Sequence, residues 1–334
     1  MLTAKTLPLT FPHSKHMGNS NAFALSFLNK TPLAKFKRYN KITSLKSSFQ
    51  SNEDLISAQT RVKILSEAGS FIQKFRGKTI VIKYGGAAMR SEALQASVIA
   101  DIVLLSSIGL RIVVVHGGGP EINHWLERLG IKPNFVNGLR VTDALTMEIV
   151  SMVLVGKVNP HFVAWIKKDG AAAVELPAIG ICTLRPTPQL GYVADISEVD
   201  PTMLQLYVDN NIIPVIAPVA ADEAGQLYNI NADIMAGEVA GAMGAEKLIL
   251  LTDVAGILED RDNPESLVKE IDIRGVKKMI DEGKIAGGMI PKVNCCLRAL
   301  AQGVRTTSII DGRLKHSLLL EVLTDEGAGT MITG

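Results

Sequence analysis

Short, continuous apolar runs alternate with longer amphipathic stretches along most of this chain. Each run is rich in Val, Ile and Leu and is followed by glycine or a polar turn, which is typical of a strand buried on both faces. Strands that alternate with helices predict a three-layer α/β/α sandwich with a mostly parallel central sheet. The runs begin at Thr79, Arg111, Ile212, Lys247 and Val304.

The stretches between the runs carry apolar residues at three- and four-residue steps, so they are predicted to form helices. One of them, residues 53–76, precedes the first strand, and we expect it to pack on its own domain or on another subunit. The segment 171–196 is expected to form a lid or an edge rather than core. The other predicted helices span residues 91–110, 121–129, 143–155, 160–168, 201–209, 233–244, 276–282 and 286–302.

Residues 1–52 differ in composition from the rest of the chain. They contain eight Lys or Arg, no Asp or Glu, many Ser and Thr, and no sustained apolar period. This composition is typical of an organellar transit peptide rather than a secretory signal or a spanning helix, and the excess of Lys over Arg favours a plastid. We expect a disordered leader that is cleaved between about residues 45 and 55; a disordered basic tail is the alternative.

The remaining chain carries 27 basic against 33 acidic residues, so its charge gives no support for nucleic-acid binding. We expect neither nucleic acid nor membrane among its partners. The three cysteines, Cys182, Cys295 and Cys296, fit neither a disulfide framework nor metal-ligand spacing, and we interpret them as small buried hydrophobic residues. No metal ligand from a protein side chain is predicted.

Glycine-rich turns recur beside the predicted strands and helices. The first follows Lys83 and contains Gly85 and Gly86. Glycine lets backbone N–H groups approach an anion closely, and the lysine adds positive charge. Because the carboxyl ends of parallel strands share one edge, we expect the first two turns to lie together there. The pattern does not fit the dinucleotide fingerprint Gly-x-Gly-x-x-Gly. The other turns lie at 115–119, 251–256 and 286–292.

A second lysine, Lys292, stands beside a glycine pair in the other half of the chain. Phosphoryl transfer needs fixed positive charge and hydrogen-bond donors around its transition state. Two lysines together with the N–H groups of the first two glycine turns would supply both. Those N–H groups belong to Gly85, Gly86, Gly117 and Gly118.

Three further polar side chains stand near these turns or on the hairpin that Asn137-Gly138 predicts. Asp233 is either an ordinary acidic residue of a helix N-terminus or the carboxylate that holds both lysines. Arg140 is either a surface cation or a two-pronged clamp for a carboxylate. We interpret His116 as structural.

Six motifs, in this order and spacing, resemble those of the acetylglutamate kinases within the amino-acid kinase family. The resemblance covers residues 54–334 and, with the leader, points to the plastid form of plants. It implies ATP-dependent phosphorylation of the γ-carboxylate of N-acetyl-L-glutamate in arginine biosynthesis, with Mg²⁺ and without a covalent enzyme intermediate. The motifs are Lys-Tyr-Gly-Gly, His-Gly-Gly-Gly-Pro, Asn-Gly-Leu-Arg-Val-Thr, Asn-Ile-Asn-Ala-Asp, Leu-Thr-Asp-Val-Ala-Gly-Ile-Leu and Gly-Gly-Met-Ile-Pro-Lys.

The resemblance also implies a role for each candidate residue. Lys83 and Lys292 would stabilise the transferring phosphoryl group, and Asp233 would organise them. The halves 77–210 and 211–334 would bind mainly acetylglutamate and ATP. The substrate residues would be Gly117, Gly118, Arg140 and Asn229, with the α-carboxylate on Arg140. The ATP residues would be Gly85, Gly86, Thr252, Asp253, Gly256, Leu258, Lys284, Gly287 and Met289.

Regulation is implied by the same resemblance. Arginine-inhibited members carry an extra N-terminal helix that links three dimers into a homohexamer, which makes residues 53–76 an oligomerisation helix. Plant members bind the PII signalling protein in the chloroplast stroma. The implied L-arginine site comprises Lys247, Glu326, Gly327 and Gly329.

One segment departs from the family pattern. Between Val174 and Val193 a shorter sequence replaces the family's glycine-rich loop, and Ala194 stands where glycine is expected. Because this segment lies outside the two-lysine site, we expect fold and chemistry to survive. The alternatives are another amino-acid kinase or a catalytically idle sensor of arginine and PII; the retained lysines and aspartate argue against the sensor.

Overall fold

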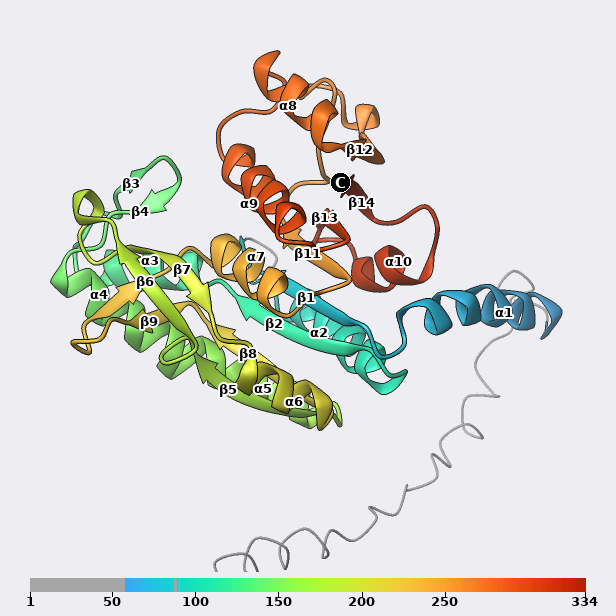
Figure 1. The fold of residues 1–334 in the computed structure, drawn as a ribbon, viewed down its shortest axis with the longest axis horizontal. Helices are drawn as coiled ribbons and strands as arrows, with labels where there is room; N and C mark the ends of the chain where they lie inside the picture. Colours follow the sequence, from blue (N-terminus) through green and yellow to red (C-terminus); the bar gives the residue numbers. More distant parts are fainter. Residues whose placement is uncertain (1–57, 87–88, 90) are drawn as a thin grey trace, which may run out of the picture. The chain divides into compact units, whose positions relative to one another are not determined.

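An eight-stranded sheet lies at the centre of the part of the chain that this computed structural model describes, residues 58–86, 89 and 91–334 (Figure 1). Its order is β12-β14-β13-β11-β1-β2-β8-β5, and every pair is parallel except β13 with β14, so the predicted architecture is confirmed. The predicted leader and residues 53–57 lie outside the described residues. The strands are β1 Thr79–Tyr84, β2 Arg111–His116, β5 Ala172–Pro177, β8 Ile212–Ala217, β11 Lys247–Thr252, β12 Glu270–Asp272, β13 Thr306–Asp311 and β14 Gly329–Thr333.

Helices cover both faces of this sheet (Figure 1). One face packs against α6, α7, α8 and α9, and the other against α2, α5 and α10. The helices are α1 Ala58–Phe75, α2 Glu92–Ser107, α3 Gly119–Arg128, α4 Ala144–Val153, α5 Asn159–Lys168, α6 Thr202–Asp209, α7 Ala232–Ala242, α8 Ile273–Asp281, α9 Met289–Ala301 and α10 Ser317–Leu323.

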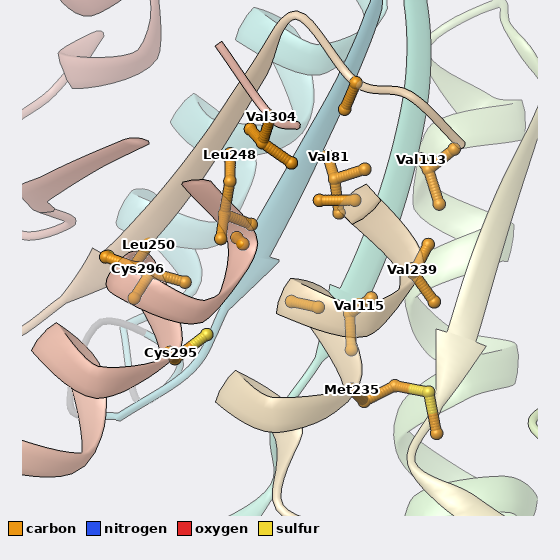
Figure 2. Close-up of a cluster of buried hydrophobic side chains, with 14 of the residues drawn as sticks. Val81, Val113, Val115, Met235, Val239, Leu248, Leu250, Cys295, Cys296 and Val304 are labelled. Carbon is orange, nitrogen blue, oxygen red and sulfur yellow. The ribbon is translucent and has the colours of Figure 1, made fainter. Parts of the chain in front are cut away.

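The alternation of side chains along β1 decides which face each residue serves. Val81 belongs to the cluster with α7 and α9, whereas Ile80 and Ile82 belong to the cluster with α2, α5 and α10. Figure 2 shows the first cluster, in which Val81 lies with side chains of α7 and α9. Because successive side chains of a strand point to opposite faces, Lys83 follows Val81 toward α7 and α9. In β2 the same rule sends His116 to the opposite face.

The cysteines were predicted to be small buried hydrophobic residues, without disulfides. Cys295 and Cys296 are buried on α9 within the cluster of Figure 2, and all three cysteines are free thiols. Cys182 is half-buried on β6, and burial raises the pKa of its thiol to about 11. The interpretation as small buried residues is therefore confirmed for the pair on α9.

The predicted helices 143–155 and 160–168 are one continuous helix of 25 residues. The α4 and α5 segments are joined by a π-turn, Leu154–Val158, instead of a loop. Pro160 did not break the helix, because proline at the second position of a new α-helical segment lacks an N–H that is not needed there. The helix is apolar and long enough to cross a membrane, yet its buried side chains belong to the core clusters of this domain.

The segment 171–196 is an edge, as predicted, but it also contributes core. Strand β5 forms the end of the main sheet, and β6 (Cys182–Pro186) pairs with β7 (Ala194–Val199) in a separate antiparallel ribbon. Ala178, Ile181 and Ile196 are buried in the cluster with α7 and α9. The prediction that this segment lies outside the core is therefore wrong for these residues.

Two small hairpins border the carboxyl edge of the sheet. One joins β3 (Phe135–Val136) to β4 (Leu139–Arg140) through Asn137 and Gly138, whose φ angles are 51° and 81°. Positive φ at both turn residues is the geometry that Asn-Gly favours, so the predicted hairpin is confirmed. The other joins β9 (Val219–Ala221) to β10 (Leu227–Asn229).

Candidate functional site

The first two glycine turns touch where β1 and β2 end. The strands are in register, with Tyr84 opposite His116. A Cβ on Gly117 would lie 3.4 Å from the Cα of Gly85, so the two turns lie together as predicted. The N–H of Gly117, however, donates to the carbonyl oxygen of Tyr84 at 2.7 Å. The prediction that this N–H contacts an anion is therefore wrong, because the neighbouring strand already uses it.

Lys83 and Lys292 each bind one oxygen of Asp233. The Nζ of Lys83 lies 2.9 Å from Oδ1, and the Nζ of Lys292 lies 3.0 Å from Oδ2. Lys83 extends from β1, Asp233 from the first turn of α7 and Lys292 from the first turn of α9. A Cβ on Gly85 would lie only 2.8 Å from the Lys83 ammonium, so glycine there lets the ammonium fold back over the turn.

Asp233 stays ionised although it is buried. Burial raises the pKa of this carboxyl, but Lys83 and Lys292 outweigh burial and hold the pKa well below its usual range. The Oδ1 of Asn231 caps α7 by accepting the N–H of Asp233 at 2.8 Å, and the thiol of Cys295 donates to the Asp233 carbonyl at 2.8 Å. Two fixed cations thus share one fixed anion, which leaves a net positive charge at this point.

A cleft of ≈ 350 Å³ opens beside these three side chains. All four residues that the sequence predicts for substrate binding line it, and so do both lysines. The geometry therefore joins two halves of the site that lie far apart in the sequence. The lining includes Lys83, Gly86, Gly117, Gly118, Arg140, Asn229, Asp233 and Lys292.

Arg140 enters this cleft as a buried cation without an acidic partner among the described residues. One guanidinium nitrogen, Nη2, donates to Oδ1 of Asn123 at 2.6 Å, and the guanidinium stacks 4.7 Å from the ring centre of Phe135. The other nitrogen, Nη1, is buried and has no hydrogen-bond partner within the part of the chain that the structure describes. Burial lowers the pKa of Arg140 to about 10, so the group remains charged. An unpaired guanidinium N–H at a cleft is suited to a carboxylate.

Asn229 faces the cleft from β10 and is held on one side only. Its Nδ2 donates to the hydroxyl of Thr142 at 3.1 Å, and that hydroxyl donates to the carbonyl of Arg140 at 2.9 Å. These bonds fix the side-chain amide of Asn229 next to the guanidinium. Its Oδ1 can then accept an N–H from a ligand, such as an amide.

A second cleft, of ≈ 370 Å³, meets the first at Lys292, which lines both. Gly86 has φ of 76°, and a Cβ there would lie 3.7 Å from the Asp253 carboxyl carbon. Thr252 is buried behind the cleft at the end of β11. Of the residues predicted for ATP, this cleft brings together Asp253, Gly256, Leu258, Lys284 and Met289.

A third cavity, of ≈ 180 Å³, lies at the other end of β11. Lys247 lines it and pairs with Glu321 of α10 at 2.8 Å. Both side chains are almost fully buried, and Glu321 also accepts the N–H of Ala328 at 2.9 Å. The predicted arginine residues Lys247, Glu326, Gly327 and Gly329 all line this cavity, together with Phe71, Lys74 and Phe75 of α1.

Two residues that hold cavity side chains in place were missed in the sequence, Asn123 and Glu321. Asn123 orients Arg140 from α3, and Glu321 neutralises Lys247 from α10. Neither stands in a glycine turn or next to one. The sequence does contain one indication for Glu321, which is the only acidic residue within the apolar run 317–323. An acidic residue in such a run predicts a buried carboxylate with a basic partner.

Comparison with known proteins finds relatives that cover most of this chain. Residues 78–311 match the model of the amino acid kinase family. The chain is 57% identical to the chloroplastic acetylglutamate kinase of Arabidopsis thaliana over 338 residues, which cover 97% of each protein. It is 56% identical to the acetylglutamate kinase of Trichodesmium erythraeum, covering 86% of this chain and 99% of that one.

A solved structure shares the fold. The N-acetylglutamate synthase of Neisseria gonorrhoeae, complexed with coenzyme A and N-acetyl-glutamate, superposes with a TM-score of 0.74 at 26% identity. The match covers 82% of this chain and 63% of the synthase chain. This chain therefore spans somewhat less than two thirds of that protein.

Proposed function

This chain belongs to the amino acid kinase family, and we propose that it is an acetylglutamate kinase that uses ATP to phosphorylate the γ-carboxylate of N-acetyl-L-glutamate in arginine biosynthesis. The observation that carries the proposal is the set of two lysines on one buried aspartate, at the junction of two clefts. The Arabidopsis and Trichodesmium relatives carry the name of this enzyme.

The first cleft is suited to an N-acylated amino diacid. Arg140 offers an unpaired guanidinium N–H for the α-carboxylate, and Asn229 offers an acceptor for the amide N–H. The γ-carboxylate would then point toward Lys83 and Lys292. A carboxylate is ionised at neutral pH, with an ordinary pKa of about 4, so it needs no general base before it attacks phosphorus.

The second cleft would hold the nucleotide, with the γ-phosphate at Lys292 where the clefts meet. The transferring phosphoryl group spreads negative charge over its oxygens, and two fixed ammonium groups stabilise that charge. Asp233 keeps the ammonium groups together without cancelling both. Among the described residues no group of three His, Cys, Asp or Glu could hold a metal, so Mg²⁺ would enter with the ATP phosphates.

Acyl-phosphate trapping tests this function. Residues 53–334 are incubated with ATP, Mg²⁺ and hydroxylamine, and N-acetylglutamate is compared with glutamate and aspartate. The proposal expects hydroxamate from N-acetylglutamate and about a hundredfold less from the amines, because Asn229 and the cleft are matched to an acylated nitrogen. Turnover of aspartate instead would indicate another amino-acid kinase. No turnover by a folded protein would favour the idle sensor.

The third cavity supports arginine as a feedback inhibitor. Acidic Glu326 and the glycine turn at 327–329 lie around the buried Lys247–Glu321 pair, so the cavity offers groups of both signs to a ligand with a carboxylate and a guanidinium. Helix α1 closes one side through Phe71 and Lys74. The test is inhibition of turnover by L-arginine, and its loss in Glu326→Ala with kcat unchanged.

Helix α1 supports the proposed hexamer. Val62 and Leu65, three residues apart on one face of α1, are 65% and 71% exposed, so the domain leaves this apolar strip uncovered. A second copy of α1 would cover this strip, and sedimentation of Leu65→Glu would then give dimers.

Docking of the PII signalling protein and residence in the chloroplast stroma are the remaining two parts of the proposal. Affinity capture with purified PII and import by isolated plastids test these two parts.

A further inference from the structure

His116 ends β2 as a fully buried side chain with both ring nitrogens engaged. Its Nδ1 lies 2.8 Å from the carbonyl oxygen of Gly117, and its Nε2 lies 3.0 Å from Nδ2 of Asn159. A carbonyl oxygen can only accept, so Nδ1 carries the proton and Nε2 accepts. The Nδ2 of Asn159 also donates to the carbonyl of Val215 at 2.8 Å, which fixes the amide in this orientation.

The partner of His116 comes from the π-turn of the long helix. In a regular α-helix two residues five apart point about 140° away from each other. The turn closes instead with an i to i+5 bond, from the N–H of Asn159 to the carbonyl of Leu154, so both residues face the glycine turn. Leu154 contacts Gly118 so closely that a Cβ there would lie 2.3 Å from its Cδ2.

The consequence for the glycine turn follows from peptide planarity. The carbonyl of Gly117 and the N–H of Gly118 belong to one trans peptide unit and point in opposite directions. Holding that carbonyl toward His116 therefore holds the Gly118 N–H away from it. Since the Gly117 N–H already donates to Tyr84, the Gly118 N–H is the donor that this peptide unit can present to a ligand.

We propose that Asn159 and His116 are positioning residues, which orient the Gly117–Gly118 peptide so that the Gly118 N–H meets the substrate or the transferring phosphoryl group. The inference rests on the proposed function and adds two residues to it. The π-turn is the device that makes this possible, because it brings the amide and an apolar side chain to the same glycine turn. Neither residue touches the ligand.

Kinetics of Asn159→Leu, measured in the full chain, test the proposal first. The variant keeps the side-chain size but leaves Nε2 of His116 without a donor. We expect kcat/KM for N-acetylglutamate to fall about ten- to a hundredfold, with KM for ATP unchanged. Ser151→Ala is the matched control, since it removes a buried hydroxyl from the same helix away from the turn. Kinetics of Asn159→Leu that match the wild type would overturn the proposal.

Asn159→Asp gives a readout that a merely structural role would not move. A carboxylate beside Nε2 favours the doubly protonated imidazole, so the pH–rate profile gains an ionisation near neutrality that the wild type lacks. Two substitutions of His116 then separate the roles of its two ring nitrogens. His116→Asn keeps a donor for the Gly117 carbonyl, whereas His116→Gln keeps the acceptor for Asn159, and we expect the first to retain more activity. Equal activity of the two variants contradicts the proposal.

Nitrogen NMR of histidine separates this inference from the proposed function. With ¹⁵N-histidine in the six histidines of the chain, the resonance missing from His116→Asn identifies His116. We expect a neutral ring with hydrogen on Nδ1 at pH 7, and a weaker preference for that tautomer in Asn159→Leu, where only the Gly117 carbonyl still favours it. If this holds while N-acetylglutamate is not turned over, the proposed function fails and the orientation of the turn stands. A His116 ring that carries its hydrogen on Nε2 would contradict the inference, whether or not the enzyme turns over N-acetylglutamate.

Discussion

Lys83 and Lys247 are buried lysines on neighbouring strands that serve opposite faces of one sheet. Lys83 is the penultimate residue of β1 and shares Asp233 with a second lysine, whereas Lys247 begins β11 and has Glu321 as its acidic partner. The first arrangement keeps excess positive charge beside a cleft. The second is neutral. A buried lysine is therefore not a catalytic signal in itself; the ratio of cations to anions around it separates a site for phosphoryl groups from a structural or regulatory pair.

Breaking the neutral pair gives the largest expected effect on stability. Glu321→Gln leaves Lys247 buried without a counter-charge, which typically costs about 3–5 kcal/mol. We expect the free energy of unfolding in urea to fall by about that amount. Lys247→Met with Glu321→Gln is the control, because removing both charges together restores most of the loss. A single variant as stable as the wild type would show that the pair contributes little.

Replacing the same residue type at the two places sharpens the comparison further. Lys83→Met removes a cation from the transition state, so we expect kcat to fall by about 10²–10³-fold. Lys247→Met should leave kcat without arginine within a few-fold, since its cavity lies at the other end of the strands. Steady-state rates with saturating substrates measure both variants. Equal losses would contradict the distinction drawn between the two lysines.

His116 extends the comparison to a buried base whose hydrogen-bond partners, the Gly117 carbonyl and the Asn159 amide, are uncharged. Burial lowers its pKa to about 4, against an ordinary value of about 6.5. Between these two pH values His116 is protonated in the unfolded chain but neutral in the folded chain. The free energy of unfolding therefore falls by about 3 kcal/mol as the pH drops from about 6.5 to about 4.

Urea unfolding at several pH values measures this decline. We expect His116→Asn to lose less stability over the same interval. Asp233 does not interfere, because a carboxylate with a lowered pKa keeps its contribution above its unfolded pKa of about 3.9 and loses it only at lower pH. Equal slopes for the two proteins would count against a neutral buried His116.

Asn123 gives the smallest expected effect. It holds one nitrogen of Arg140, a buried cation that lacks an acidic partner among the described residues. Asn123→Ala loosens the guanidinium without removing charge, so we expect KM for N-acetylglutamate to rise about tenfold with kcat nearly unchanged. Asn134→Ala, outside the clefts, is the control. A fall in kcat alone would place Asn123 in the chemical step.

The sheet and much of the site could be predicted from the sequence because both follow local patterns. Apolar runs located β1, β2, β8, β11 and β13, and the glycine turns located the edge where ligands meet. Alternation along β1 then determines that Lys83 faces α7 and α9. These features depend on a few neighbouring residues, which the sequence displays directly.

The remaining features depend on contacts between distant segments. The π-turn joins two helices that a proline appeared to separate, and its register is set by packing of Leu154 against Gly118. Helix α10 begins after His316, whose backbone is left-handed with a φ of 59°. The Nδ1 of His316 lies 2.7 Å from Oδ1 of Asp101 on α2, which stabilises this conformation. No local sequence pattern predicts the π-turn or the start of α10. The partners of Asn159 and Glu321, which are His116 and Lys247, therefore could not be assigned from the sequence.

The alternation of side chains along β1 also limits how this protein can vary over evolution. Inserting or deleting one residue in β1 ahead of Lys83 would turn Lys83 toward the opposite face, since the side-chain period of a strand is two. A deletion would place Tyr84, and an insertion Ile82, at the position facing Asp233. Either change removes the ammonium from Asp233 in one step. We therefore expect length differences among related chains to fall in surface turns such as 222–225 and 259–265, and the spacing from Thr79 to Gly86 to be kept.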